Sequence, residues 1–262
     1  MPLTLYFSSH EAEAVTASLR ELFRESEIVL VENSFTDGAD DLNENLLNEL
    51  SQGRLLPDDL REISSRIGYQ PFPAFDHELN SMIHRSGKTI VLEHPPVGVG
   101  DALKYEMLMR QQFGNTPVNE ACRQLTENLA KRADYEKKRD DALARQLTSL
   151  NRRHPDSNIL VIRGQAHQRS LGNALAALGT PARSLTSHKP MLTLFETEPM
   201  QKLIAGEKPS RRELLATLVE QVETRTPIFR PTQANIGTLR NLIDGMSDRQ
   251  CEEYLKKKLN LT

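Results

Sequence analysis

What this sequence lacks excludes several large classes of protein. It contains 2 cysteines in 262 residues, far apart along the chain, so it offers neither a disulfide framework nor a cysteine-based zinc or redox motif. No apolar run approaches the roughly 20 residues that cross a bilayer, and the first residues lack the pattern of a secretory signal. We therefore expect a cytoplasmic protein with no membrane partner.

The chain also lacks a strong net charge. It has 33 Lys and Arg against 36 Asp and Glu, so its net charge is -3 and no positive field attracts nucleic acid. The basic stretch at residues 123–153 has few aromatic residues for stacking on bases, and a solvated helical face explains it equally well. The charge pattern thus predicts no nucleic-acid partner.

Several catalytic and nucleotide-binding motifs are absent. There is no HExxH pair for zinc and no GxSxG elbow for a hydrolase serine. Ser86-Gly87-Lys88-Thr89 resembles the end of a phosphate loop, but Met82 stands where the first glycine is required. Gly98-Val99-Gly100 lacks the third glycine of a dinucleotide fingerprint, because Leu103 takes its place. None of these motifs therefore indicates the function.

Short apolar runs, separated by helical stretches, are the main structural signal that is present. Most of the runs are continuous rather than alternating, which is typical of strands buried on both faces of a parallel or mixed sheet. The alternation predicts an α/β fold with a central, mostly parallel or mixed sheet of about five strands flanked by helices. The expected strands are residues 3–7, 28–31, 89–92, 158–162 and 182–185.

We expect an α/β domain at residues 1–195 and a helical C-terminal extension at residues 196–262. Residues 40–86 carry three short helical stretches broken by glycine and proline, and they predict an insertion that lies over the sheet. The extension is either a small helical subdomain or an arm that joins copies of the chain into a homo-oligomer. Both alternatives are open from the sequence.

Ionisable residues follow each of the first four predicted strands. In an open α/β sheet the carboxyl ends of the strands meet at one edge, where ligands bind, so these residues are expected to converge. Imidazole and carboxylate groups can hold a divalent metal or can activate water directly, and the sequence does not choose between the two. The converging residues are Ser8-Ser9-His10, Glu32, Glu93-His94 and Arg163-Gly164-Gln165-Ala166-His167.

A long helix is predicted over residues 118–150, and polar residues interrupt its apolar stripe. Extending the stripe through the gap reaches Glu136 and Asp140, with Arg139 at its edge. A polar group on a core-facing stripe is costly unless it is paired or used in function. A salt bridge in the helix layer, a solvent-exposed helix middle and a functional site all fit this pattern.

Two segments in the second half of the chain resemble the TraB/TIKI family, which shares a superfamily with ChaN-like haem-binding proteins and erythromycin esterases. Arg139-Asp140-Asp141-Ala142-Leu143-Ala144 is similar to the family's Arg-Asn/Asp helix. Ile159-Leu160-Val161-Ile162-Arg163-Gly164-Gln165-Ala166-His167 is similar to its apolar strand and GxxH motif. The resemblance covers roughly residues 3–186 and extends to two earlier segments.

The first of these earlier segments, Tyr6-Phe7-Ser8-Ser9-His10, looks like the family's first GxxH, with Phe7 where the family usually has glycine. The second, Val29-Leu30-Val31-Glu32, looks like the strand that ends in its glutamate. The insertion and the helical extension have no counterpart in the resemblance.

The resemblance implies a hydrolase that cleaves an amide or ester bond of a small molecule or peptide with activated water, with metal assistance. His10 and His167 would hold a divalent metal or the attacking water, and Glu32 would act as metal ligand or general base. Mn or Co is implied by the TIKI-like relatives, and histidine and carboxylate ligands would also accept Zn. The expected metal ligands are His10, Glu32 and His167.

The other expected catalytic residues are Glu93 as a second carboxylate and Arg139, near Asp140, as hydrogen-bond donor to the developing oxyanion. A second hypothesis is a non-catalytic protein that binds a metal, haem or a small molecule at the same edge, as ChaN-like relatives imply. A third is an interaction module whose pocket has decayed, suggested by Phe7. We expect the catalytic set His10, Glu32, Glu93, Arg139, Asp140 and His167.

Overall fold

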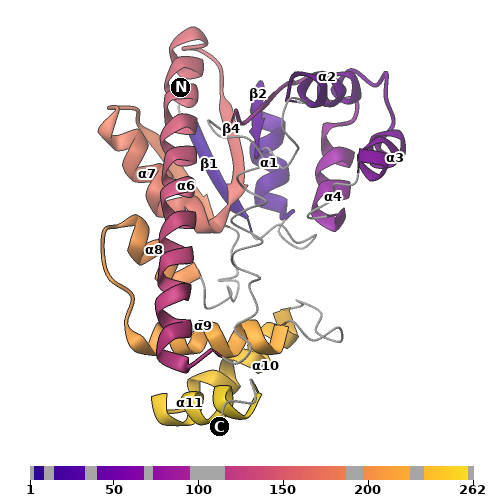
Figure 1. Ribbon diagram of the computed structural model, residues 1–262. Helices are drawn as coiled ribbons and strands as arrows, with labels where there is room; N and C mark the ends of the chain where they lie inside the picture. The colour runs from indigo at the N-terminus through magenta and orange to yellow at the C-terminus, as the bar shows by residue number, and fades with distance from the viewer. Residues whose placement is uncertain are drawn as a thin grey trace. The chain divides into compact units, whose positions relative to one another are not determined.

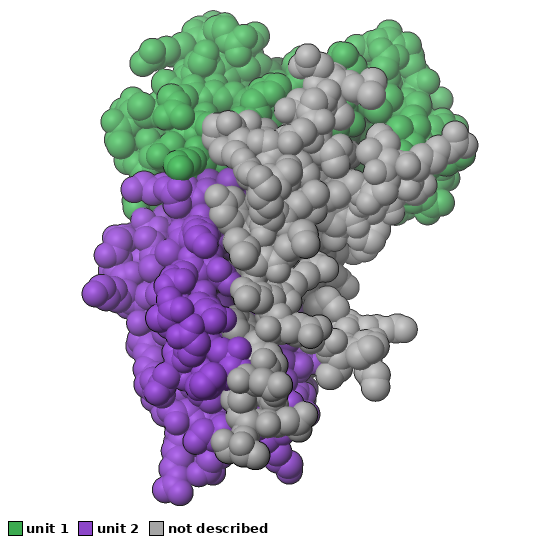
Figure 2. Space-filling view, viewed as in Figure 1, with its two compact units in different colours: residues 1–100, 138–189 green, residues 101–137, 190–262 purple. Residues whose placement is uncertain are grey.

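A computed structural model describes most of the chain (Figure 1). It forms two compact units, one of residues 1–100 and 138–189 and the other of residues 101–137 and 190–262 (Figure 2). The second unit thus includes residues 101–137 as well as the C-terminal extension expected from the sequence. The described residues are 3–8, 15–32, 40–67, 73–94, 116–186, 197–224 and 233–258.

The first unit is built on a parallel sheet. Within the described residues the sheet has five strands in the order β3-β2-β4-β1-β5, and each neighbouring pair runs parallel. This arrangement confirms the α/β fold predicted from the apolar runs. The strands are β1 (Leu3–Ser8), β2 (Ile28–Val31), β3 (Thr89–Leu92), β4 (Ile159–Gly164) and β5 (Ala182–Thr186).

Helices cover both faces of this sheet. Successive side chains of a strand point to opposite faces, so Leu5 and Tyr6 of β1 belong to different cores. Tyr6 lies in the core formed with α1 (Ala17–Glu25), α2 (Asp40–Ser51), α3 (Pro57–Ile67) and α4 (Pro73–Ile83). Leu5 lies in the core formed with the second half of α6 (Val118–Arg153) and with α7 (Gln168–Ala177).

The central strands are buried on both faces, as their continuous apolar runs predicted. Every residue of β2 and β4 is buried, whereas β5 at the edge of the sheet is partly exposed. Arg163 is the exception to apolar composition in β4, because it carries a full charge at a position that is 1% exposed. Such a side chain requires compensating partners.

Side chains of α2 cover the opposite edge of the sheet, at β3. The Asn48 amide group donates to the carbonyl of Ile90 at 2.8 Å and accepts from the Ile90 N–H at 3.0 Å. The N–H of Leu92 donates to Glu44 at 2.8 Å. These side chains take the place of a sixth strand and satisfy backbone groups that an edge strand leaves open.

We expect Asn48→Ala to lower the free energy of unfolding by about 2 kcal/mol, because it leaves a donor and an acceptor of Ile90 unpaired at a partly buried edge. Urea unfolding with an unchanged m-value measures this loss. Asn45→Ala is the matched control, since Asn45 is an exposed asparagine of the same helix. Equal stability of the two variants would contradict the assigned role of Asn48.

The second unit is helical in its described part. Its core combines the first half of α6 with four C-terminal helices, and α9 is buried without a break over residues 214–221. A capping box at Ser210 and Glu213 starts α9: the Ser210 N–H donates to the glutamate at 2.7 Å and the Glu213 N–H donates to Ser210 at 3.3 Å. The C-terminal helices are α8 (Thr197–Ile204), α9 (Arg211–Thr224), α10 (Gln233–Asp244) and α11 (Asp248–Lys258).

In the described segments, no helix combines the length and the apolar character that crossing a bilayer requires.

Candidate functional site

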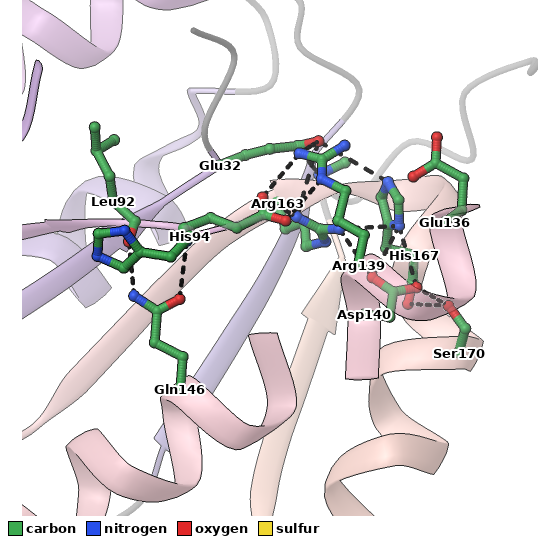
Figure 3. A network of polar contacts seen from close by, with 12 residues as sticks. Glu32, Leu92, His94, Glu136, Arg139, Asp140, Gln146, Arg163, His167 and Ser170 are labelled. Carbon is green, nitrogen blue, oxygen red and sulfur yellow. Dashed lines mark hydrogen bonds and ion pairs between the residues drawn. The ribbon is translucent and has the colours of Figure 1, made fainter. Parts of the chain in front are cut away.

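Three of the expected site residues lie at the carboxyl ends of neighbouring strands, and Figure 3 labels two of them, Glu32 and His167. Glu32 directly follows β2, Glu93 directly follows β3, and His167 lies three residues beyond the end of β4. The backbone ladder extends to both glutamates, because Glu32 N–H donates to Ile162 and Glu93 N–H donates to Val31, each at 3.1 Å. The two carboxylates are therefore fixed side by side at the carboxyl ends of β2 and β3.

Helix α6 brings Arg139 to these carboxylates. The guanidinium makes a bidentate pair with Glu93, from Nε to Oε1 at 2.7 Å and from Nη2 to Oε2 at 2.8 Å. Its Nη2 also donates to Oε1 of Glu32 at 3.1 Å. Arg139 thus joins the ends of β2 and β3, and its side chain keeps 12% of its surface exposed. A bidentate geometry of this kind fixes the planes of both groups.

Gln146, two turns further along α6, holds the backbone on both sides of Glu93. Its Nε2 donates to the carbonyl of Leu92 at 2.7 Å, and its Oε1 accepts from the N–H of His94 at 3.1 Å (Figure 3). The side chain of Glu93 is fully buried between these contacts. No pattern in the sequence indicated a role for Gln146, although its amide positions an expected site residue.

Arg163, buried in β4, lies at the centre of the network. Its Nη1 donates to Oε2 of Glu93, and its Nη2 donates to Oδ1 of Asp140 at 2.8 Å. Burial lowers the pKa of the Arg163 guanidinium and so does nearby Arg139, but the surrounding carboxylates outweigh both and raise the pKa above its ordinary value. Arg163 therefore carries a positive charge that two buried carboxylates share.

Asp140 and His167 form a buried pair beside this guanidinium. Nδ1 of His167 lies 3.0 Å from Oδ1 and 3.2 Å from Oδ2 of Asp140, and the Ser170 hydroxyl donates to Oδ2. Nη2 of Arg163 lies 3.2 Å from the same Nδ1. Because an ionised carboxylate only accepts hydrogen bonds and Oδ1 of Asp140 is nearer to Nδ1 than the guanidinium is, we assign the ring proton to Nδ1, donating to Asp140. Nε2 then carries the lone pair, 3.9 Å from Oε1 of Glu32.

The surroundings of Asp140 keep it ionised. Burial raises the pKa of its carboxyl, but His167, Arg163 and the Ser170 hydroxyl outweigh burial and lower the pKa to about 2, from an ordinary value of 3.8. Asp140 is therefore a carboxylate at neutral pH, able to orient the imidazole and to stabilise its protonated form.

This lowered pKa predicts a pH dependence of stability. A carboxyl whose pKa falls from 3.8 to about 2 on folding stabilises the protein above about pH 4, by about 2 kcal/mol, and this contribution disappears as the pH falls through about 2. We expect the difference in unfolding free energy between the native chain and Asp140→Asn to shrink by that amount between about pH 5 and pH 2. Exposed Asp156→Asn controls for the loss of one carboxylate. A difference that stays constant over this range would contradict the prediction.

Hydrogen bonds already engage the two expected metal ligands that the structure describes, Glu32 and His167. Within the described part of the chain no group of three or more His, Cys, Asp and Glu side chains is arranged to hold a metal. Both oxygens of Glu32 already accept hydrogen bonds, one from Arg139 and one from the N–H of Gly164 at 2.8 Å. A dication ligated by Glu32 and His167 would meet the guanidinium of Arg139, which repels it. The remaining expected ligand, His10, lies outside the described residues.

The structure thus brings five of the expected catalytic residues into one hydrogen-bonded network, and the sixth, His10, lies outside the described residues. The five are Glu32, Glu93, Arg139, Asp140 and His167.

Arg163 was among the residues expected to converge but was given no role, and Ser170 was not expected in the network at all. The signal for Arg163 was visible as a charge inside an otherwise apolar strand. Ser170 had no signal, because a serine in the first turn of a helix is common. Glu136, which the sequence placed on the apolar stripe of α6, belongs to the second unit and is buried. Its Oε1 lies 3.8 Å from Nε of Arg132.

The chain was compared with protein-family models, with curated proteins and with solved structures, and none of the three comparisons found a match.

Proposed function

We propose that this protein is a hydrolase that cleaves an ester or amide bond with a water molecule activated by His167. The observation that carries the proposal is the buried Asp140–His167 pair with Nε2 of the imidazole 3.9 Å from Oε1 of Glu32. The three residues come from α6, from the end of β4 and from the end of β2, and they meet where parallel sheets bind ligands. The TraB/TIKI resemblance of the same residues supports the same class of reaction.

The arrangement can activate water without a metal. A water molecule within hydrogen-bond reach of both Nε2 of His167 and Oε1 of Glu32 donates one proton to each, since the two acceptors are 3.9 Å apart. His167 removes the proton as the water attacks the carbonyl carbon, and Asp140 stabilises the imidazolium that forms. His167 then returns the proton to the leaving alcohol or amine.

Arg139 is the positive group that supports the oxyanion. Its side chain is 12% exposed, whereas that of Arg163 is 1% exposed, so Arg139 is the guanidinium within reach of a substrate. Its bidentate contact with Glu93 fixes the guanidinium before the substrate arrives, and preorganised charge of this kind lowers the barrier to acyl transfer.

Hydrolysis of a panel of p-nitrophenyl esters and short peptide amides tests the proposal. We expect the native chain to hydrolyse a member of the panel and His167→Gln to lower kcat about 10²- to 10⁴-fold, the usual range for a general base. His154→Gln, which replaces an exposed histidine, is the matched control. A native chain that cleaves no ester or amide contradicts the function, and full activity of His167→Gln contradicts the role of that residue.

The same assay decides whether a metal assists, as the resemblance implied. We propose that activity persists after treatment with EDTA and 1,10-phenanthroline, and that elemental analysis finds no stoichiometric Mn, Co or Zn. Loss of activity on chelation and its recovery with one of these metals would instead establish the metal-assisted form of the reaction.

A further inference from the structure

Arg163 directly contacts three residues of the candidate site, although neither the sequence motif nor the proposed chemistry assigns it a role. It contacts Glu93 through Nη1, Asp140 through Nη2 at 2.8 Å, and Nδ1 of His167 through Nη2 at 3.2 Å. Its Nε is buried and has no hydrogen-bond partner among the described residues. Its polar contacts are thus directed at the site residues.

The position of Arg163 in the fold is rigid. Strand β4 lies between β1 and β2 in the sheet, and all of its residues are buried. A guanidinium is planar and presents its donors in fixed directions, so one that is locked in a central strand fixes the positions of the carboxylates that accept from it. Here those carboxylates come from the end of β3 and from α6, which are separate elements.

We propose that Arg163 is a positioning residue, which holds Asp140 to accept the hydrogen bond from Nδ1–H of His167 and holds Glu93 to clamp Arg139. Arg163 acts through these residues and is too buried to contact a substrate. The catalytic part of this proposal rests on the proposed hydrolysis. Its structural part is that Arg163 fixes the tautomer of His167, which can be measured without a substrate.

A purely structural ion pair would give a different result. If Arg163 only neutralised buried charge, its removal would change stability and leave the His167 ring unaltered in the folded molecule. If Arg163 fixes Asp140, its removal lets the carboxylate turn away, and the imidazole proton is then shared between Nδ1 and Nε2. The nitrogen signals of the ring distinguish the two cases.

Long-range ¹H–¹⁵N spectra of protein labelled with ¹⁵N-histidine measure this tautomer. At a pH where the ring signals show a neutral imidazole, we expect His167 of the native chain to be protonated at Nδ1 alone, its signals assigned by their loss in His167→Gln. We expect Arg163→Met to show a mixture of both tautomers. Arg183→Met is the matched control, because Arg183 is an exposed arginine in β5 of the same sheet.

A second variant keeps the proposal testable if Arg163→Met alone does not fold. Arg163→Met leaves Glu93 with one positive partner fewer, and the double variant Glu93→Gln/Arg163→Met removes the opposing charge as well. We expect the same mixture of tautomers in the double variant. A native His167 spectrum in both folded variants would overturn the proposal.

Kinetics on an ester that the native chain cleaves provide the second measurement. We expect Arg163→Met to lower kcat about 100-fold with little change in KM, because misplaced catalytic groups slow the reaction without removing substrate contacts. Arg163→Lys should not restore the rate, since an ammonium group keeps the charge but cannot bridge two carboxylates. Full rescue by lysine would contradict positioning by the guanidinium. If no substrate is cleaved, the proposed hydrolysis fails while the tautomer measurement still decides the role of Arg163.

Discussion

Arg163→Met is expected to lower the free energy of unfolding by about 3 to 5 kcal/mol, the range measured when one partner of a buried ion pair is removed. The physical reason is that Glu93 and Asp140 are 0% and 1% exposed and lose a shared guanidinium. Water cannot replace that partner at either carboxylate, because the site is buried. Urea unfolding with an unchanged m-value measures the loss.

Two control variants separate this effect from the loss of any arginine. Arg249→Met removes an exposed pair with Glu253, in which the arginine side chain is 88% exposed, and should cost less than about 0.5 kcal/mol. Glu93→Gln/Arg163→Met should be more stable than Arg163→Met, since it does not leave the Glu93 charge with a missing partner. A loss below about 1 kcal/mol for Arg163→Met would show that the network does not depend on this guanidinium.

Asp140→Asn is expected to lower kcat about 10³- to 10⁴-fold on an ester that the native chain hydrolyses, with KM little changed. A neutral amide can donate to the imidazole, which favours the tautomer that has its proton on Nε2, and it does not stabilise the imidazolium. The lone pair that removes the proton from water is then absent. Steady-state kinetics measure the loss, and Asp156→Asn should leave kcat unchanged because Asp156 is exposed and lies outside the network.

The outcome for Ser170 refines this prediction. Ser170→Ala removes one hydrogen bond to Asp140 and leaves those from His167 and Arg163, so its effect on kcat should be smaller than that of Asp140→Asn. Retention of more than about a tenth of the native kcat by Asp140→Asn would contradict the orienting role of this carboxylate.

The strands could be predicted because few other structures would bury their apolar residues. Continuous runs of β-branched and leucine side chains, as at residues 28–31 and 159–162, bury well only in a strand that is covered on both faces. The edge at β3 could not be predicted, because the groups that cover it belong to Asn48 and Glu44 of a helix that looks ordinary in sequence.

The candidate site was predicted in its residues but not in its connections. Glu32, Glu93 and His167 were found because each follows an apolar run, and Asp140 because it interrupts an apolar stripe. Arg163 was quoted within a motif and given no role, since its partners Glu93 and Asp140 lie 70 and 23 residues away along the chain. No local pattern indicates which carboxylates a buried guanidinium will meet.

The sequence by itself determined the α/β class, the strands and the polar residues at their ends, because hydrophobic periodicity and residue type act locally. Only the tertiary structure decided that β2 lies between β3 and β4. It also decided that α6 packs over the sheet and brings Arg139 and Asp140 to the carboxyl ends of the strands. It also decided that Arg139 and Arg163 pair with the carboxylates of the site. Strand order and helix placement are set by the packing of distant segments, and the side chains that share a charge depend on that packing.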